Sequence, residues 1–356
     1  RIEYNAAGER LGLLVEEART NLVASSENIG GTGWATLTTN VTKTDGIAWS
    51  GITPSLLTNN AGAGVVGAIT LNFTANAAPY TQTLILERGT SLARTNFGIY
   101  QGGWVGLVAY NWDTKLIENG AGTIDSSSVE QLGIGPNGGD LVRLSMTSTP
   151  AAGTAGFYFY FYGSGGGSVQ ADSSLYFYTA QLEAGAFPTS YIPTSGATAT
   201  RAADVCSMPV SAFGYNQAEG TVVVQASYFG SNSNGRMWEL SDGTNANFIT
   251  IYKSGSDRLY TYMTSSGTQQ NNMEVADPAS KDTLYKIAYA FAPNDAASTA
   301  QGNTPVVDAS IDVPSVDTLY IGRRFQVAQY QLNGHIKSIQ YIPRRLTNAQ
   351  LQELTQ

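Results

Sequence analysis

Few side chains in this sequence could serve as a nucleophile or a general base. His335 is the only histidine and Cys206 the only cysteine among 356 residues, which excludes disulfide frameworks, multi-histidine metal centres and Cys/His zinc sites. A glycosidase needs two carboxyl groups that face one cleft. Glu239 and Asp242 are close in sequence, but Asp242 precedes a glycine and fits a hairpin turn better. We therefore predict a non-enzymatic protein with no catalytic residues.

The residues best suited to another kind of chemistry, sugar binding, are aromatic. A sugar presents an apolar C–H face that stacks on an exposed ring, while its hydroxyls pair with Asn, Asp, Gln or Arg. Trp112 lies between Asn111 and Asp113 near the end of an expected strand, and Tyr110 shares its strand parity. With Trp104, these residues form the candidate glycan site. Burial of Trp104 and Trp112 in a sandwich core is an equally good interpretation.

A second candidate site is a loop of oxygen-bearing side chains. Asp242, Asn245 and Asn247 lie within one short segment. Calcium binds where several oxygen ligands converge. The loop is a candidate calcium site, although a polar hairpin explains the same residues equally well, and no other cofactor is expected.

The charge balance excludes some partners. There are 19 Lys and Arg against 27 Asp and Glu, a formal net charge of -8. Such a chain gains little from counterion release, so we predict no nucleic-acid partner. No apolar run of about 18 residues is present, so we predict no membrane insertion. The pairs Arg323-Arg324 and Arg344-Arg345 either form salt bridges on a solvated face or dock an acidic neighbour.

Short β-strands are expected to carry these side chains. The 39 Gly and 20 Tyr residues are typical of short strands joined by tight turns. Phe and Tyr alternate strictly over residues 157–162, so the Phe rings fall on one face of a strand and the Tyr rings on the other. We predict that the Phe face belongs to the core and that the Tyr face is solvated or covered by another subunit.

The pattern as a whole predicts an all-β chain. We expect two tandem antiparallel β-sandwiches and a short C-terminal helix, which Thr347 and Gln350 would open with a capping box. The Pro-, Ser- and Thr-rich stretch near residue 190 marks a domain boundary. The predicted divisions are an extended arm at 1–24, a first sandwich at 25–200, a linker at 201–218 and a second sandwich at 219–356.

Four segments resemble those of known proteins. GLLVEEARTNL (12–22) and QLEAGAFPTSYIPT (181–194) resemble the opening and closing segments of a β-sandwich module in tailed-phage virion proteins. Residues 219–356 resemble a concanavalin A-like (laminin-G-like) sandwich, chiefly through LNGHIK (332–337) and YIPRRLTNAQL (341–351). The resemblance implies a jelly-roll domain like a carbohydrate-binding module, followed by a concanavalin A-like domain.

The resemblance also implies a function. We expect a phage virion surface protein (head fibre, head spike, tail fibre or capsid decoration) that holds host or environmental glycans weakly through many copies. Its partners would be other virion proteins, and a homotrimer is the expected assembly. A purely structural role is one alternative. Another is a glycan-binding accessory region of a secreted polysaccharide-degrading enzyme or depolymerase. Because the chain starts at Arg1 without an initiator methionine, we interpret it as a fragment of a longer polypeptide.

Overall fold

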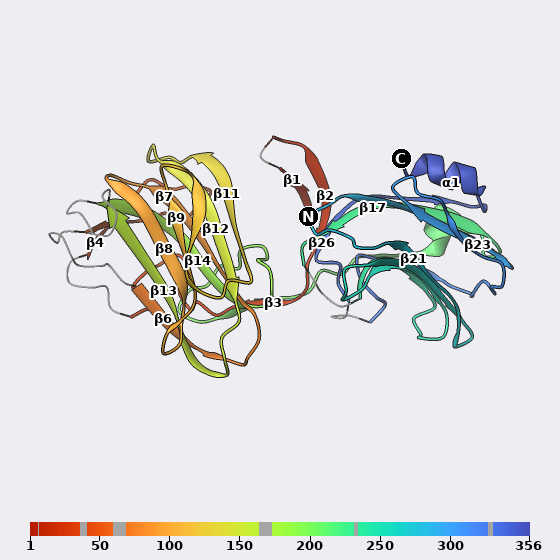
Figure 1. Ribbon diagram of the computed structural model, residues 1–356, viewed down its shortest axis with the longest axis horizontal. Coiled ribbons are helices and arrows are strands. Elements are labelled where there is room, and N and C mark those ends of the chain that lie inside the picture. Colours follow the sequence, from red (N-terminus) through yellow and green to blue (C-terminus); the bar gives the residue numbers. More distant parts are fainter. Residues whose placement is uncertain (6, 36–40, 60–68, 164–172, 231–233, 327–329) are drawn as a thin grey trace. The chain divides into compact units, whose positions relative to one another are not determined.

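The computed structural model describes residues 1–356 except 6, 36–40, 60–68, 164–172, 231–233 and 327–329 (Figure 1). The described chain is built almost entirely of β-strands in antiparallel sheets, with one short C-terminal α-helix, α1 (Asn348–Leu354). This confirms the all-β fold class. The chain divides into two bodies, one made of residues 19–201 and the other of residues 1–18 and 202–356.

This division corrects the predicted arm and linker. Residues 1–18 belong to the second body because β2 (Arg10–Val15) pairs with β26 (Gly334–Ile342), and Val15 is buried in that body's core. Residues 202–218 belong there too, since β16 (Ser207–Pro209) joins one of its sheets and Phe213 packs 5.3 Å from Tyr341. The first body is therefore an insertion within the second. The local pattern of residues 1–24 could not show this, because the strand that β2 pairs with lies near the other end of the chain.

The 19–201 body is a sandwich of two sheets around one core. Leu84 and Leu144 from one sheet, and Phe97 and Phe157 from the other, are fully buried in that core. Its five-stranded sheet runs β10 (Leu116–Gly122), β9 (Trp104–Asn111), β8 (Leu92–Tyr100), β13 (Gly153–Gly163), β6 (Ile69–Ala75). Its six-stranded sheet runs β11 (Ser126–Ile134), β12 (Asp140–Ser148), β7 (Tyr80–Arg88), β14 (Ser174–Ala184), β5 (Ser55–Asn59), β4 (Val41–Asp45).

The segments that resemble phage modules lock the two ends of this body together. β3 (Arg19–Asn21) pairs with β15 (Ala199–Arg201). The buried side chain of Asn21 donates to the carbonyl of Ile192 at 2.9 Å and accepts from the amide of Leu182 at 3.2 Å. Buried polar groups are costly unless they are hydrogen-bonded, so this side chain fixes how the opening and closing segments meet.

The second body is also a two-sheet sandwich around one core. Val224 and Tyr289 from one sheet, and Trp238 and Ile251 from the other, are fully buried in it. The seven-stranded sheet runs β1 (Ile2–Tyr4), β2, β26, β17 (Gly220–Tyr228), β22 (Tyr285–Ala292), β23 (Asp295–Ala300), β24 (Val306–Asp308). The six-stranded sheet runs β16, β25 (Thr318–Ile321), β18 (Gly235–Ser241), β19 (Phe248–Lys253), β20 (Leu259–Ser265), β21 (Thr268–Ala276), and a short 3-10 helix, η1 (Val210–Phe213), follows β16.

The C-terminal helix begins as the sequence predicts. Thr347 is the N-cap, and the capping box with Gln350 is complete in both directions. Leu351 is fully buried and packs with Ala290 and Ala297 of the seven-stranded sheet. The helix therefore covers part of the outer face of that sheet.

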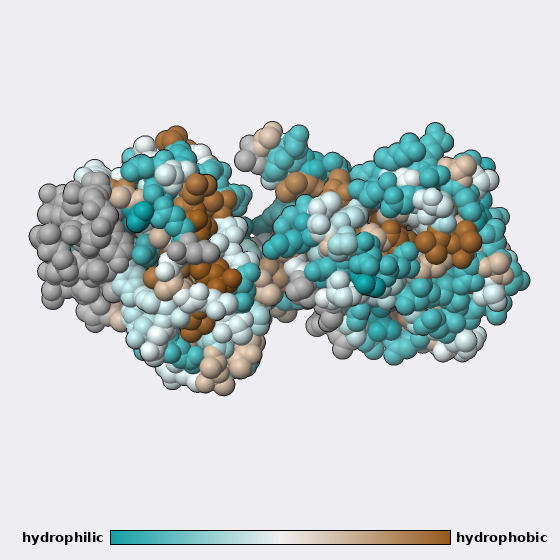
Figure 2. Space-filling view, viewed as in Figure 1, coloured by the Kyte–Doolittle hydropathy of each residue, from teal (hydrophilic) through white to brown (hydrophobic). Residues whose placement is uncertain are grey.

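Some large hydrophobic side chains of the described residues are exposed. On the side viewed in Figure 2, hydrophobic residues gather in a stripe on the 19–201 body and in a smaller group on the second body. Leu116 and Ile134 of the 19–201 body are 62% and 71% exposed. No helix among the described residues is long and apolar enough to cross a membrane.

The N-terminal hairpin gives the second body an acid-sensitive contact. The hydrogen bond from His335 (2.7 Å) lowers the pKa of Glu3 to about 2 against the opposing effect of partial burial, and Arg1 also lowers it. A carboxyl with a lowered folded-state pKa stabilises the fold above its ordinary pKa of 4.5, and this contribution is lost as the pH falls towards 2.

We predict that Glu3→Gln weakens the pH dependence of stability in this window. Urea unfolding of wild type should show a loss of stability as the pH falls from 4.5 to about 2, and the variant should show a smaller loss. Glu9→Gln, at an exposed position of the same hairpin, is the matched control. Identical pH profiles for wild type and Glu3→Gln would contradict the assignment.

Candidate functional site

Strand β13 has two chemically different faces. Phe157 and Phe159 are fully buried, whereas Tyr158 and Tyr160 are half-buried on the opposite side of the strand. The side chains of residues 161 and 162 lie outside the described part of the chain. For residues 157–160 the prediction of a core Phe face and an outer Tyr face is confirmed.

Four rings gather on this outer face of the five-stranded sheet, and we call Tyr100, Trp104, Tyr158 and Tyr160 the aromatic platform. The centroid of Trp104 lies 5.3 Å from that of Tyr100, 5.7 Å from Tyr158 and 5.8 Å from Tyr160. These contacts are edge-to-face, a favoured geometry for aromatic pairs. Tyr100 is 37% exposed and the other three rings are half-buried, so the rings hold one another while part of their surface stays open to solvent.

A β-bulge brings Trp104 to the platform. Ile99 pairs with Gly106, but the next residue, Tyr100, pairs with Trp104, so the register shifts by one residue between β8 and β9. The shift reverses the side-chain parity of β9. Trp104 therefore lies on the opposite face of the sheet from Tyr110 and its core neighbours.

Glycine makes room for one ring of the platform. A Cβ at Gly156 would lie 2.5 Å from Cε2 of Tyr158. The ring of Tyr158 therefore leans along its own strand over Gly156, towards Tyr100, whose centroid is 5.5 Å away.

Polar side chains lie on the same face of the sheet. Arg94 and Glu118 form an ion pair at 3.0 Å, and Nδ2 of Asn111 donates to Glu118 at 3.0 Å. Asn96 lies opposite Tyr160, and its buried Oδ1 has no hydrogen-bond partner among the described residues. Such groups can exchange hydrogen bonds with the hydroxyls of a ligand.

The structure corrects the prediction for Tyr110 and Trp112. Both are fully buried in the sandwich core, with ring centroids 4.9 Å apart, and Nε1 of Trp112 donates to Thr95 at 2.9 Å. Burial also raises the pKa of Tyr110. The two residues do share a face, as the sequence predicts, but it is the core face, because their parity matches that of Val108. Neither ring can stack on a sugar in this structure.

The other two predicted site residues, Asn111 and Asp113, lie at the turn after β9. Oδ1 of Asn111 accepts from the backbone amides of Asp113 and Thr114, at 3.0 and 3.2 Å. Asp113 is exposed and pairs with Arg88 at 2.5 Å. Of the five predicted glycan residues, the structure therefore places only Trp104 in the aromatic platform, with Asn111 further along the same face.

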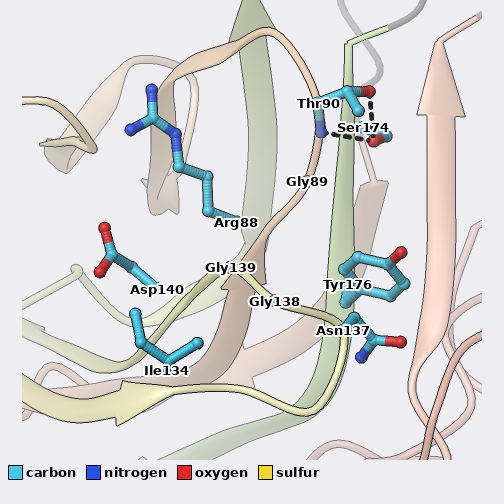
Figure 3. Close-up of a pocket in the computed structure, with 10 residues that line it drawn as sticks. All are labelled: Arg88, Gly89, Thr90, Ile134, Asn137, Gly138, Gly139, Asp140, Ser174 and Tyr176. Carbon is cyan, nitrogen blue, oxygen red and sulfur yellow. Dashed lines mark hydrogen bonds between the residues drawn. The ribbon is translucent and has the colours of Figure 1, made fainter.

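A hydrophilic pocket of about 380 Å³ lies beside Arg88. Figure 3 shows Thr90 and Ser174, joined by hydrogen bonds, on one side of it, and Arg88 and Asp140 on the other. Asp140, the carboxylate that lines it, pairs with Lys115 at 2.8 Å. The full lining is Arg88, Gly89, Thr90, Ile134, Asn137, Gly138, Gly139, Asp140, Ser174 and Tyr176.

A second carboxyl near this pocket is occupied by structural contacts. Glu87 is fully buried and accepts hydrogen bonds from the hydroxyl of Tyr178 (2.7 Å), from Asn137 (2.9 Å) and from the amide of Gly139 (2.9 Å). Burial and the carboxylate raise the pKa of Tyr178. Glu87 and Asp140 therefore do not form a pair of free carboxyl groups facing one cleft.

The predicted calcium loop is closed by its own hydrogen bonds. Oδ1 of Asp242 accepts from Thr244 at 2.6 Å, and Oδ2 accepts from Asn247 at 2.8 Å. Oδ1 of Asn245 accepts from the guanidinium of Arg324 at 2.7 Å. The described residues hold no group of three or more His, Cys, Asp or Glu side chains placed for a metal ion. Calcium binding at this loop stays a prediction.

No protein-family model matches the sequence, and no curated protein is significantly similar to it. Several solved structures resemble part of the chain. The CBM40 domain of a Ruminococcus gnavus sialidase bound to alpha2,3 sialyllactose is 14% identical, with 40% of this chain and 84% of that chain covered and a TM-score of 0.35. A pentraxin from Limulus polyphemus is also 14% identical (40% and 74% covered, TM-score 0.34), and sheep galectin-11 is 9% identical (39% and 98% covered, TM-score 0.28).

We predict stability losses of different size for two tryptophans, Trp104 of β9 and Trp112 of the turn that follows it. Trp112→Ala should lower the free energy of unfolding of the 19–201 body by about 3–5 kcal/mol, because it empties a fully buried site. Trp104→Ala should cost about 1 kcal/mol, since it removes only contacts between partly exposed rings. Urea unfolding followed by circular dichroism measures both. Equal losses would contradict the assignment of the two rings to different faces.

Proposed function

We propose that this chain is a non-enzymatic adhesion protein that holds glycans on the aromatic platform. The observation that carries the proposal is the placement of Tyr100, Trp104, Tyr158 and Tyr160 on the outer face of a sheet whose inner face forms the core. Tyr and Trp rings offer large apolar surfaces at a low cost in conformational entropy. The C–H face of a pyranose ring matches such a surface.

The polar groups beside the platform suit sugar hydroxyls. Asn96, next to Tyr160, offers an acceptor, while Arg94 and Glu118 form a charged pair on the same face. A flat sheet face with a few polar groups gives weak binding to each sugar, because it buries only one side of the ligand. We therefore propose that useful affinity comes from several copies bound to one surface.

The ion pairs at the pocket beside Arg88 favour ligand binding over catalysis. Arg88 pairs with Asp113, and Lys115 with Asp140. Hydrolysis of a glycosidic bond by two carboxyls needs one kept protonated and the other free to act as base or nucleophile. The carboxylates at and beside this pocket are instead taken up by protein partners.

We further propose that the chain is displayed on the outside of a tailed-phage virion. The support is the resemblance of residues 12–22 and 181–194 to phage β-sandwich modules. Hydrogen bonds of Asn21 join these two segments at the ends of one body.

We predict that glycan binding depends on the platform. A glycan array of host-surface polysaccharides with the full chain should show binding that Trp104→Ala and Tyr158→Ala each weaken about tenfold, or about 1.4 kcal/mol, because each removes a ring on which the sugar stacks. Tyr4→Ala, which removes an exposed aromatic ring of the second body, is the matched control.

Three outcomes of this array would be informative. Binding that survives both platform variants would contradict the proposed site. An absence of binding by wild type across the array would favour the purely structural role. Release of sugar from the polysaccharides would favour the depolymerase alternative.

We predict that the protein forms a homotrimer in solution. Repetition of the platform around a threefold axis would supply the multivalency that weak sites need, and the exposed Leu116 and Ile134 offer apolar surface for subunit contact. Size-exclusion chromatography with light scattering should give the mass of three chains. A monomer at high concentration would contradict this assembly.

A further inference from the structure

The second body has a pocket that combines buried arginine with aromatic rings. Its volume is about 260 Å³. None of the glycan or calcium candidates lines it, and it lies in the second body, whereas the aromatic platform belongs to the 19–201 body. The lining residues are Asn234, Arg236, Phe248, Tyr252, Tyr262, Arg324 and Tyr330.

The outer face of the six-stranded sheet forms one side of this pocket. Arg236 of β18 lies opposite Tyr252 of β19. Ile249 and Ile251 point into the core, so by alternation Phe248 and Tyr252 lie on the outer face. Arg324 and Tyr330, which follow β25, complete the lining.

Two guanidinium groups lie against rings in this pocket. The Cζ of Arg236 is 4.5 Å from the ring centroid of Tyr252 and 5.6 Å from that of Tyr330. The Cζ of Arg324 is 5.2 Å from the centroid of Phe248 and 5.6 Å from that of Tyr330. Cation–π contacts of this kind hold the guanidinium planes in place, so the donors are fixed before any ligand arrives.

The two arginines of the pocket are neutralised only in part by a neighbouring carboxylate. Glu239 is fully buried and is the carboxylate that pairs with both arginines, at 3.4 Å from Arg236 and 3.9 Å from Arg324. Its Oε2 makes no well-aligned hydrogen bond to either guanidinium, and the other oxygen accepts from the amide of Phe325 at 3.1 Å. Two cations and one anion leave a net positive charge.

Arg236 also has unused donors. Its residue is only 7% exposed, yet Nε and Nη1 have no hydrogen-bond partner among the described residues, and the same holds for Nε of Arg324. Burial lowers the pKa of the Arg236 guanidinium, because the charged form loses its hydration there. Buried charged donors without a hydrogen bond are rare in folded proteins, and a bound ion or ligand is one explanation for them.

We propose that this pocket binds the carboxylate of an acidic sugar, with the carboxylate at Arg236 and Arg324 and the pyranose ring against the tyrosines. The guanidinium fork matches a carboxylate in geometry as well as in charge. An anion there would neutralise the excess charge and pair the unused donors.

The shape of the pocket favours a sugar over a bare anion. Its volume of about 260 Å³ lies just below the range of sites for drug-sized ligands, so it accommodates about one ring. Tyr252, Tyr262 and Tyr330 offer apolar faces together with hydroxyl groups. A simple anion such as acetate would fill only part of this volume.

The test compares acidic sugars with their methyl esters, which keep the ring and remove the charge. The probes are trisaccharides of galacturonate, glucuronate and mannuronate, each with its ester, titrated calorimetrically into the full chain. At least one acid should bind, and its ester should bind about tenfold or more weakly, since a charge-assisted hydrogen bond is lost. Arg324→Gln should weaken the acid by a similar factor.

Matched variants separate binding from folding. Arg344→Gln removes an exposed arginine of the same body and should leave affinity unchanged. If Arg324→Gln fails to fold, Arg324→Lys keeps the charge but loses the fork, and should still weaken binding. Because the pocket and the platform lie in different bodies, Trp104→Ala should not change this affinity, so failure of one proposal is distinguishable from failure of the other.

Four results would overturn the proposal. They are equal binding of acid and ester, no binding of any of the three acids at millimolar concentration, full affinity in Arg324→Gln, and equal binding of a triglutamate peptide, which would indicate a site for acidic peptides instead.

Discussion

The strict alternation of Phe and Tyr in β13 is the constraint on which the first body depends. Successive side chains of a strand point to opposite faces, so if Phe157 and Phe159 enter the core, Tyr158 must face away from it. A one-residue slip in register would bury the hydroxyls and expose the Phe rings. The pairing of β13 with β8 and β6 is thus strongly specified, and the platform is a consequence of the same pairing that builds the core.

The sequence predicts the fold class well and the chain's path less well. Alternation, turn residues and the capping box of Thr347 are local signals, and the all-β fold and the C-terminal helix follow from them. The pairing of β2 with β26 is a contact between the two ends of the chain. No local pattern contains it, and for this reason the sequence predicts only an extended arm at residues 1–24.

The difference between local signals and long-range contacts also explains which site residues the sequence predicts correctly. The Tyr face of β13 was predictable, because it needs only strand parity. The assignment of Trp112 as a binding residue is wrong because an aromatic between polar neighbours looks the same whether its ring points outward or into the core. Trp104 differs from Trp112 through the register shift after Ile99, and only the three-dimensional pairing reveals it. Tyr100 needs no such shift, because alternation after the core residues Phe97 and Ile99 already places it on the outer face.

We propose that Trp104 contacts the ligand, whereas Trp112 is part of the core. The most direct measurement is an NMR spectrum of the tryptophan indole groups, assigned by substitution, with and without a glycan that the chain binds. The account predicts that the Trp104 indole signal shifts on addition of glycan while the Trp112 and Trp238 signals stay in place. A bound glycan that leaves the Trp104 signal unmoved would contradict it.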